Sequence, residues 1–200
     1  MQERPTTRIF SILALATFTG MLGMTIIIPL IPIYMERLTL SPIWVGVIFA
    51  VFSGTRLILA PIIGRLSDRR GRKYFLVIGL LLSALASLGY IWASADWHLV
   101  LVRILHGAAS GMVYPIAMSY LGDITPKGSE GKWMGYFNGV VFTSFGLGPL
   151  FGGLLAERFG ILVTFSAVSG LCLLSLLLVL AALPESLSRQ AAEKKTASFR

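Results

Sequence analysis

The chain has 200 residues, of which 56% are hydrophobic and 13% are charged, and its mean hydropathy is +0.81. This composition excludes an ordinary soluble domain, in which about 25% of residues are charged. The net charge of +8 does not indicate nucleic acid binding, because the sequence offers no soluble domain or aromatic-rich basic face to carry it. The single Cys172 lies in an apolar stretch without a partner for an intrachain disulfide or a metal site, so we interpret it as a packing residue.

The first uncharged stretch runs from Ile9 to Met35 and follows Arg4 and Arg8. A secretory signal peptide also places basic residues before an apolar run, but that run spans only about 7–15 residues. We therefore expect an uncleaved membrane span at the start of the chain.

Six predominantly apolar stretches are each long enough to cross about 30 Å of hydrocarbon as a helix. The predicted fold is an all-α membrane protein with six transmembrane helices at Ile9–Tyr34, Ile43–Ile63, Tyr74–Ala95, Trp97–Tyr120, Trp133–Ala156 and Ile161–Leu183. Residues 1–184 form the predicted transmembrane bundle, and residues 185–200 form a polar cytoplasmic segment that is either a central loop or a tail.

The orientation of the bundle follows from its Lys and Arg residues, because basic loops resist translocation. One side of the predicted membrane carries thirteen of them, near both termini and in the loops around residues 65–73 and 127–132. The other side carries only Arg37 and Arg158. Both termini are therefore predicted to be cytoplasmic, which agrees with an even number of spans.

The loop between the second and third predicted spans contains a regular pattern of glycines and charges. It reads Gly64-x-x-x-Asp68-Arg69-x-Gly71-Arg72-Lys73. Every position of this pattern resembles the signature of the major facilitator superfamily. A loop selected only for cytoplasmic bases would explain the arginines but not the spacing of the glycines and the aspartate.

Physical chemistry explains the residue types in this signature. Gly64 allows a neighbouring helix to approach closely, and Gly71 permits a tight turn with positive φ. Asp68 can act as a charged latch at a helix N-terminus. The resemblance implies that Asp123, directly after the fourth span, pairs with Arg72 to close the cytoplasmic side; a solvated loop acid is the alternative.

The fifth span carries small residues and a proline in the order Ser144-x-x-x-Gly148-Pro149-x-x-Gly152-Gly153. This run is similar to the antiporter motif of the same superfamily, with Ser144 in place of a glycine. Pro149 removes one backbone donor, while the small residues form a face for close helix contact. The motif makes the drug:proton antiporter group the closest in pattern.

The fourth span places Arg103, His106, Gly107, Ser110, Gly111 and Tyr114 at helical spacing on one face. Arg103 with Gly107 is similar to a family motif that is linked to proton coupling in drug antiporters. A charge inside a bilayer indicates function, although an arginine near the helix end could also extend outward. His106 could titrate near physiological pH or simply pack as a neutral ring.

Arg56 lies inside the second predicted span and is less familiar from the family pattern. We expect it to face a central cavity. All nine Asp and Glu residues of the chain map to span ends or loops, so the interior contains no acid. An interior with Arg56 and Arg103 suits an anionic or amphiphilic substrate better than a cation. Arg56, Arg103, His106 and Tyr114 are the candidates for substrate or proton handling.

Two short segments that end in glycine share a sequence pattern. Gly64-x-Leu66-x-Asp68-Arg69-x-Gly71 recurs as Gly153-x-Leu155-x-Glu157-Arg158-x-Gly160. The first copy is predicted to be cytoplasmic and the second external. Two sets of three helices with inverted topology form a recurring transporter plan, although helix-end residues also recur by chance.

The resemblance implies a secondary active transporter that uses alternating access, with proton-coupled efflux of a small molecule as the expected activity. Uptake or exchange of an anionic metabolite is one alternative, and a non-transporting membrane scaffold or assembly protein is another. An enzyme is not expected, because His98 and His106 do not provide a cluster of catalytic side chains. No cofactor or metal is expected, and the sequence lacks the Gly-Lys-Ser/Thr loop that cradles ATP.

The expected partners are a small-molecule substrate, protons and the lipid bilayer of the cell inner (plasma) membrane, without nucleic acid. The family fold has a second six-helix bundle. We therefore expect this chain to be the N-terminal half of a transporter, either as a fragment or as a chain that pairs with another six-helix chain.

Cysteine labelling from outside the cell tests the predicted topology. A cysteine introduced at position 37 or 96 should react with a membrane-impermeant reagent, whereas one at position 70 or 195 should not. The opposite pattern would overturn the topology and weaken the assignment of the signature loop.

Overall fold

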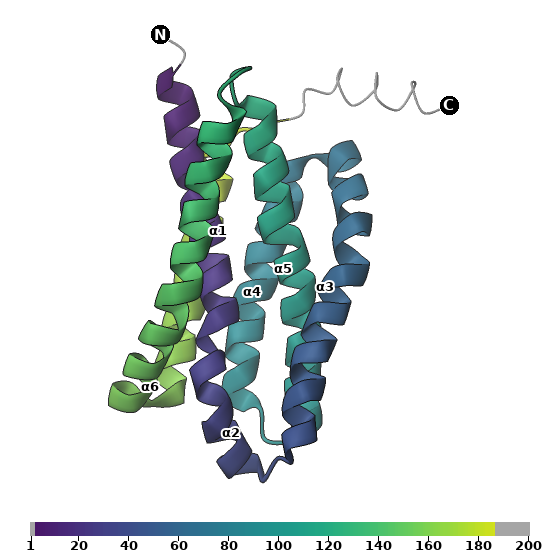
Figure 1. Cartoon of the computed structure of the whole chain (residues 1–200), viewed down its shortest axis with the longest axis vertical. Coiled ribbons are helices and arrows are strands. Elements are labelled where there is room, and N and C mark those ends of the chain that lie inside the picture. Colours follow the sequence, from purple (N-terminus) through teal and green to yellow (C-terminus); the bar gives the residue numbers. More distant parts are fainter. Residues whose placement is uncertain (1–2, 187–200) are drawn as a thin grey trace.

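A computed structural model describes residues 3–186, and the side chains from residue 7 onward. Every regular element in this range is a helix (Figure 1). The elements in chain order are α1 (Glu3–Ile26), the 3-10 helix η1 (Ile28–Leu30), α2 (Ile31–Leu38), α3 (Pro42–Arg70), α4 (Arg72–Trp92), α5 (Asp96–Ile124) and α6 (Glu130–Ala182).

Five helical segments are long and apolar enough to cross a membrane within the described range: Thr7–Leu38, α3, α4, α5 and α6. The prediction of an all-helical membrane fold is therefore confirmed. The predicted ends differ from the helix ends by several residues. For example, the second span was predicted to end at Ile63, but α3 continues to Arg70. Charged residues mark where a segment leaves the hydrocarbon, whereas the helix itself continues until Gly71 changes the backbone direction.

The first predicted span is interrupted rather than ended by its two prolines. Pro29 lies at the start of η1 and Pro32 at the start of α2, after α1 has ended at Ile26. A proline has no N–H to donate to the preceding turn, so the first positions of a new helical segment accommodate it without the loss of a hydrogen bond. The chain then ends α2 at Leu38, where Thr39 adopts a left-handed φ of 50°.

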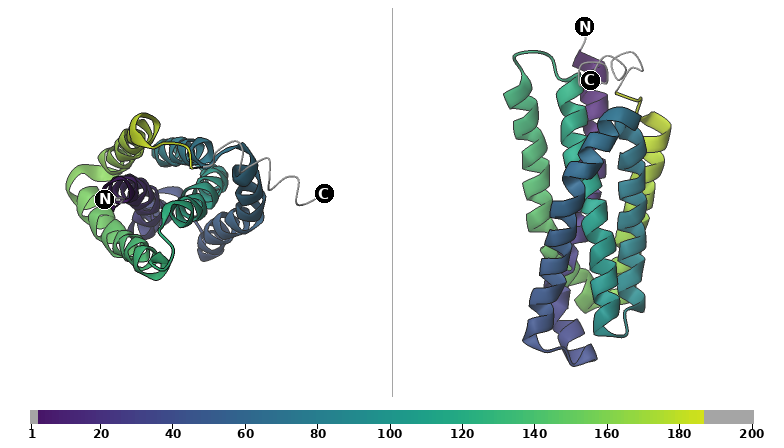
Figure 2. Two further views of the ribbon diagram at one scale, coloured as in Figure 1. Left: turned by 90° about the horizontal axis from the view of Figure 1, so that it is seen from above. Right: turned by 90° about the vertical axis from the view of Figure 1, so that its right-hand side faces the viewer.

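The long helix α6 corresponds to the two spans predicted at 133–156 and 161–183. Its 53 residues include one non-helical residue, Gly160, with φ 82° and ψ 170°. Figures 1 and 2 show that the segment after this point runs back beside the bundle in the opposite direction. We refer to residues 130–159 as the first segment of α6 and residues 161–182 as the second.

Residues 3 and 186 lie at the same end of the bundle, which we call the terminal end (Figure 1). The break at Gly160, helix α2 and the α4–α5 turn lie at the opposite end. Helix α1 packs mainly against α6, and α5 packs mainly against α3 and α4. The first span is the most enclosed of the five and α3 is the most exposed.

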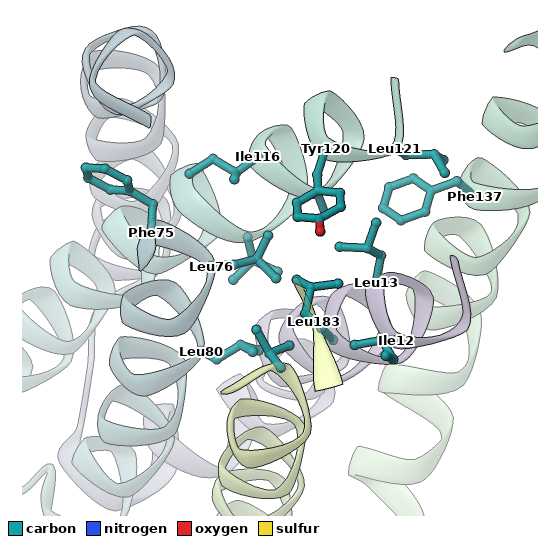
Figure 3. Packing of buried hydrophobic residues seen from close by; sticks show 14 of the residues in the cluster. Ile12, Leu13, Phe75, Leu76, Leu80, Ile116, Tyr120, Leu121, Phe137 and Leu183 are labelled. Atoms are coloured by element: carbon teal, nitrogen blue, oxygen red, sulfur yellow. The ribbon is translucent and has the colours of Figure 1, made fainter. Parts of the chain in front are cut away.

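The buried apolar residues form two clusters along the bundle. The cluster nearer the terminal end brings together Leu13 of α1, Leu76 of α4, Tyr120 of α5 and Phe137 of α6, each of which is fully buried (Figure 3). Lipid tails are as apolar as these side chains, so close van der Waals packing holds the helices together more than exclusion from water does.

Small residues of α6 allow α1 to approach it closely. A Cβ added at Gly148 would overlap the Thr25 hydroxyl, and one at Gly152 would lie 2.8 Å from the carbonyl oxygen of Ile26. Two hydrogen bonds also join the helices: Thr25 Oγ1 donates to the Ser144 carbonyl at 3.2 Å, and Thr19 Oγ1 donates to Ser175 Oγ at 3.0 Å. The contact therefore depends on glycine at 148 and 152.

Replacing Gly148 or Gly152 by alanine should separate α1 from α6. Overpacking of this kind costs about 1–3 kcal/mol, so both variants should unfold at a lower temperature than the parent protein in a thermal melt in detergent. Gly170→Ala is the matched control on the same helix, since a Cβ there meets nothing within 4 Å. Equal melting temperatures for all three variants would contradict the packing described here.

Candidate functional site

The signature turn joins α3 to α4 at the terminal end of the bundle. Gly71 adopts φ 104°, as its place in the turn predicted, and its N–H donates to the Ser67 carbonyl at 3.0 Å. A Cβ on Gly71 would lie 2.6 Å from Glu185 Oε2. Both the backbone angle and the space at this position therefore require glycine.

Arg72 lies at the centre of this site and is 5% exposed. Its Nη2 donates a hydrogen bond to Asp68 Oδ1 at 3.2 Å, and its Nε lies 3.1 Å from Asp123 Oδ2 as an ion pair without hydrogen-bond geometry. The structure thus brings together the three residues that the resemblance grouped. Two carboxylates at the ends of α3 and α5 neutralise one buried guanidinium at the start of α4.

Glu185 adds a fourth charge that the sequence analysis did not assign to the site. Its Oε1 accepts the N–H of Arg72 at 2.9 Å, and its Oε2 accepts the N–H of Lys73 at 3.3 Å. Asp68 was predicted to be a latch at a helix N-terminus, but the carboxylate at the N-terminus of α4 is that of Glu185. Asp68 instead lies in the last turn of α3. From the sequence, Glu185 was placed only in the polar segment that follows the predicted bundle.

Further hydrogen bonds hold the segment after α6 against the same turn. Lys73 Nζ donates to the Leu180 carbonyl at 2.8 Å, and the Tyr120 hydroxyl donates to the Pro184 carbonyl. Ser186 Oγ donates to Asp123 Oδ2 at 3.4 Å. We call Asp68, Arg72, Asp123 and Glu185 the signature cluster; it connects the ends of α3, α4, α5 and α6.

Two signature residues lie apart from this network. A Cβ on Gly64 would meet no atom within 4 Å of the described residues, so the expected close approach of another helix does not occur here. Arg69 is exposed at the end of α3.

Arg103 on α5 is buried among aromatic rings, with 1% of its surface exposed. Its guanidinium carbon lies 5.1 Å from the ring centre of Phe49, 5.3 Å from that of Phe52 and 5.9 Å from that of Tyr90. Its Nε and Nη2 make no hydrogen bond to any described residue. The side chain therefore does not extend outward to the surface, and aromatic faces surround the charge.

His106 lies one turn further along α5 and is also fully buried. Its Nδ1 is 3.4 Å from the Tyr90 hydroxyl, and its Nε2 makes no hydrogen bond in the part of the chain that the structure describes. Tyr34 donates a hydrogen bond of 2.6 Å to the carbonyl of Tyr90. Arg103, His106 and Tyr90 thus form a second polar group, between α3, α4 and α5.

Arg56 and Tyr114 form a third polar group, separate from Arg103. The guanidinium carbon of Arg56 lies 6.0 Å from the centre of the Tyr114 ring, and the Tyr114 hydroxyl donates to Asn138 Oδ1 of α6 at 3.3 Å. All three side chains are half-buried. The residues predicted to share one face of the fourth span are therefore divided between two places, and Asn138 was missed because only the fold brings α6 beside α5.

The small residues of α5 serve packing. A Cβ on Gly107 would lie 2.7 Å from the Phe52 carbonyl oxygen, and one on Gly111 would lie 3.6 Å from backbone atoms of Ala60. In the motif of the fifth span, Gly148 and Gly152 contact α1, and Gly153 lies near Pro29. Pro149 lies within α6, where only Gly160 departs from helical geometry.

No group of three or more His, Cys, Asp or Glu residues that could hold a metal ion occurs between residues 3 and 186. The site is thus made of paired charges at one end of an apolar helix bundle and of arginines without an acidic partner among the described residues inside it. Fold and site together define an integral membrane protein with a charge network suited to holding helix ends together.

Comparison with known proteins identifies the family. The profile of the Major Facilitator Superfamily matches residues 13–200, so the chain belongs to this superfamily of transporters. The superfamily predicted from the motifs is confirmed by this match.

The relatives include an archaeal transporter and bacterial resistance proteins. The chain is 38% identical over 151 residues to an uncharacterised MFS-type transporter of Methanocaldococcus jannaschii, covering 76% of this chain and 39% of that protein. It is 35% identical over 180 residues to multidrug resistance protein 2 of Bacillus subtilis, covering 90% and 45%. It is 32% identical over 140 residues to the quinolone resistance protein NorA of Staphylococcus aureus, covering 70% and 36%.

A solved structure shares the fold. The human organic anion transporter MFSD10 superposes with a TM-score of 0.79 at 19% identity, over 94% of this chain and 50% of that one. The chain spans less than half the length of the curated relatives it matches.

Replacing Glu185 tests its place in the signature cluster. Glu185→Ala removes the acceptors for two N–H groups at the start of α4, a loss of about 0.5–2 kcal/mol, and should lower the melting temperature in detergent by about 2–6 °C. Glu185→Gln keeps an acceptor oxygen and should lose less. Glu157→Ala, an exposed acid at the opposite end, is the control. A melting temperature for Glu185→Ala equal to that of the parent would contradict the capping role.

Proposed function

We propose that this chain is the N-terminal half of a secondary active transporter that exports a small molecule in exchange for protons by alternating access. The observation that carries the proposal is the signature cluster, which ties the ends of four helical segments with two ion pairs and a capping carboxylate. Such a network is stable only while these ends stay together. It is suited to hold one side of a transporter closed and to break when that side opens.

The proposed topology has six spans, because α6 would cross the membrane once before Gly160 and once after it. Both termini then lie on the side with more basic residues, the cytoplasm, and the protein resides in the plasma membrane. The first three spans and the next three would form inverted repeats. In support, the two echoing segments both end in a glycine with positive φ, at opposite ends of the bundle: Gly71 with 104° and Gly160 with 82°.

A second six-helix bundle, in the same polypeptide or in another chain, would complete the transporter. The substrate would bind between the two bundles at the middle of the bilayer. Drug efflux is favoured because several relatives are named for resistance to multiple drugs or to quinolones.

The buried group of Arg103, His106 and Tyr90 would serve proton coupling. The guanidinium stays protonated and cannot itself carry a proton, so it can only bind an anion or adjust a neighbour. His106 is the adjacent group that can bind and release a proton, and its free Nε2 is available when the site opens.

One alternative function has its own support. An interior with two arginines and no acid is unusual for a transporter of cations and favours uptake or exchange of an anionic metabolite. A non-transporting scaffold remains the other alternative, and it predicts that the signature cluster has no effect on flux.

Asp68→Asn tests the proposed function. The substitution keeps the shape of the side chain but removes the charge that pairs with Arg72, so the closed state should be weakened. We expect the initial rate of substrate flux in proteoliposomes of the assembled transporter to fall about tenfold, which corresponds to about 1.4 kcal/mol. Membrane insertion should be unchanged. Glu36→Gln, at the opposite end, is the matched control. Normal flux from Asp68→Asn at normal expression would count against a transport latch.

A further inference from the structure

Arg56 lies at the midpoint of the most exposed candidate span. Helix α3 runs from Pro42 to Arg70, so fourteen residues separate Arg56 from either end, and its Cα lies roughly 21 Å from each end at 1.5 Å per residue. Within the predicted span Ile43–Ile63, Arg56 lies seven residues, roughly 10 Å, from the Ile63 end, so its charge is inside the hydrocarbon. It is expensive there unless an opposite charge or several hydrogen bonds accompany it.

The described residues provide no opposite charge for Arg56. Both ion pairs found between residues 3 and 186 involve Arg72. The contact that the structure gives to the Arg56 guanidinium is the ring of Tyr114. None of the nine acidic residues of the sequence lies inside a predicted span. Among the described residues, the charge of Arg56 is therefore left without an acidic partner.

Arg56 and Arg103 differ in accessibility. Arg103 is 1% exposed and enclosed by aromatic rings of α3 and α4, so a bound molecule cannot reach it in this conformation. Arg56 of α3 is half-buried and lies against the ring of Tyr114 of α5. The first segment of α6, α5 and α3 lie side by side in Figure 1. Of the two interior arginines, only Arg56 is placed to meet a ligand.

Asn138, the hydrogen-bond partner of Tyr114, provides a further donor group near this ring. The Tyr114 hydroxyl donates to the Asn138 carbonyl oxygen, which leaves the amide NH₂ of Asn138 free to donate to a ligand. Guanidinium and amide donors are both complementary to the oxygens of a carboxylate or sulfonate. We call Arg56, Tyr114 and Asn138 the anion triad.

Apolar side chains lie beside these donors on the same face of α6. Phe142 and Phe145 follow Asn138 at helical spacings of four and seven residues, so the three share a face. Phe142 is 73% exposed and Phe145 is 40% exposed. A ligand with a charged head and an aromatic body could therefore place the head at the triad and the body against these rings.

We propose that the anion triad binds the carboxylate or sulfonate head of an amphiphilic organic anion, and that this anion is the transported substrate. That the bound anion is transported rests on the proposed transport function, whereas the binding site is argued from the contacts of Arg56 alone. The proposed site therefore prefers anions, whereas a transporter for cationic drugs prefers cations.

The test compares two fluorescent probes that share a pyrene body on a four-carbon chain and carry head groups of opposite charge, 1-pyrenebutyrate and 1-pyrenebutylamine. Binding to the assembled transporter in nanodiscs is measured by fluorescence titration, with empty nanodiscs of the same lipid subtracted. The parent protein should bind the carboxylate at least about tenfold more tightly than the amine, because the guanidinium of Arg56 attracts a carboxylate and repels an ammonium group. A preference for the amine, or none, would overturn the proposal. A fixed carboxylate from another bundle that neutralises Arg56 would give this same negative result.

Variants assign the preference to the triad. Arg56→Gln should weaken binding of 1-pyrenebutyrate about tenfold and leave the amine unchanged, and Arg56→Lys should be intermediate because it keeps the charge but loses the planar fork. Arg37→Gln, an exposed arginine at the opposite end, is the control and should change neither constant. Unchanged carboxylate binding in Arg56→Gln would overturn the assignment.

A second variant tests the same site in case Arg56→Gln does not fold. Asn138→Asp keeps the size of the side chain, adds an internal partner for Arg56 and should reverse the preference between the two probes. Retention of the carboxylate preference would overturn the proposal. The two proposals can fail separately. If the probes bind as expected but Asp68→Asn does not change the flux, the proposed latch is wrong and the anion triad is unaffected.

Discussion

The buried guanidinium of Arg72 is the interaction on which the terminal end of the bundle depends. It lies at the first turn of α4 between the carboxylates of Asp68 and Asp123, while Glu185 caps the backbone of the same turn. Removing one partner of a buried charge costs more than the pair itself contributes, because the remaining charge loses its compensation. The ion pairs with Asp68 and Asp123 therefore hold the ends of α3 and α5 against the start of α4.

The buried charge inside the bundle also needs compensation, but aromatic rings rather than carboxylates surround it. Arg103 and His106 have no carboxylate beside them among the described residues and are surrounded by rings of α3 and α4. Aromatic faces attract a cation but do not replace all of its hydrogen bonds. Nε and Nη2 of Arg103 and Nε2 of His106 therefore make no hydrogen bond to any described residue, and both side chains are closed to ligands in this conformation.

Close packing of complementary helix surfaces holds the helices together. Glycines of α6 allow α1 to lie against it, and glycines of α5 allow α3 to approach α5, as the contacts of Gly148 and Gly107 show. In lipid this close fit replaces the hydrophobic effect as the source of packing energy. Because both halves of α6 turn about Gly160, one central helix, α1, can contact both of them.

The sequence by itself determined the helical membrane fold, the family, the approximate spans and the residues of the signature turn. It could do so because a bilayer requires every backbone group to be bonded within its own helix, which makes hydropathy and charge placement sufficient evidence. Only the tertiary structure decided which side chains meet. Glu185 reaches a turn 113 residues away, Asn138 joins Tyr114, and Arg103 is separated from Arg56. These contacts depend on which helices are neighbours, and helical spacing within one segment carries no information about that.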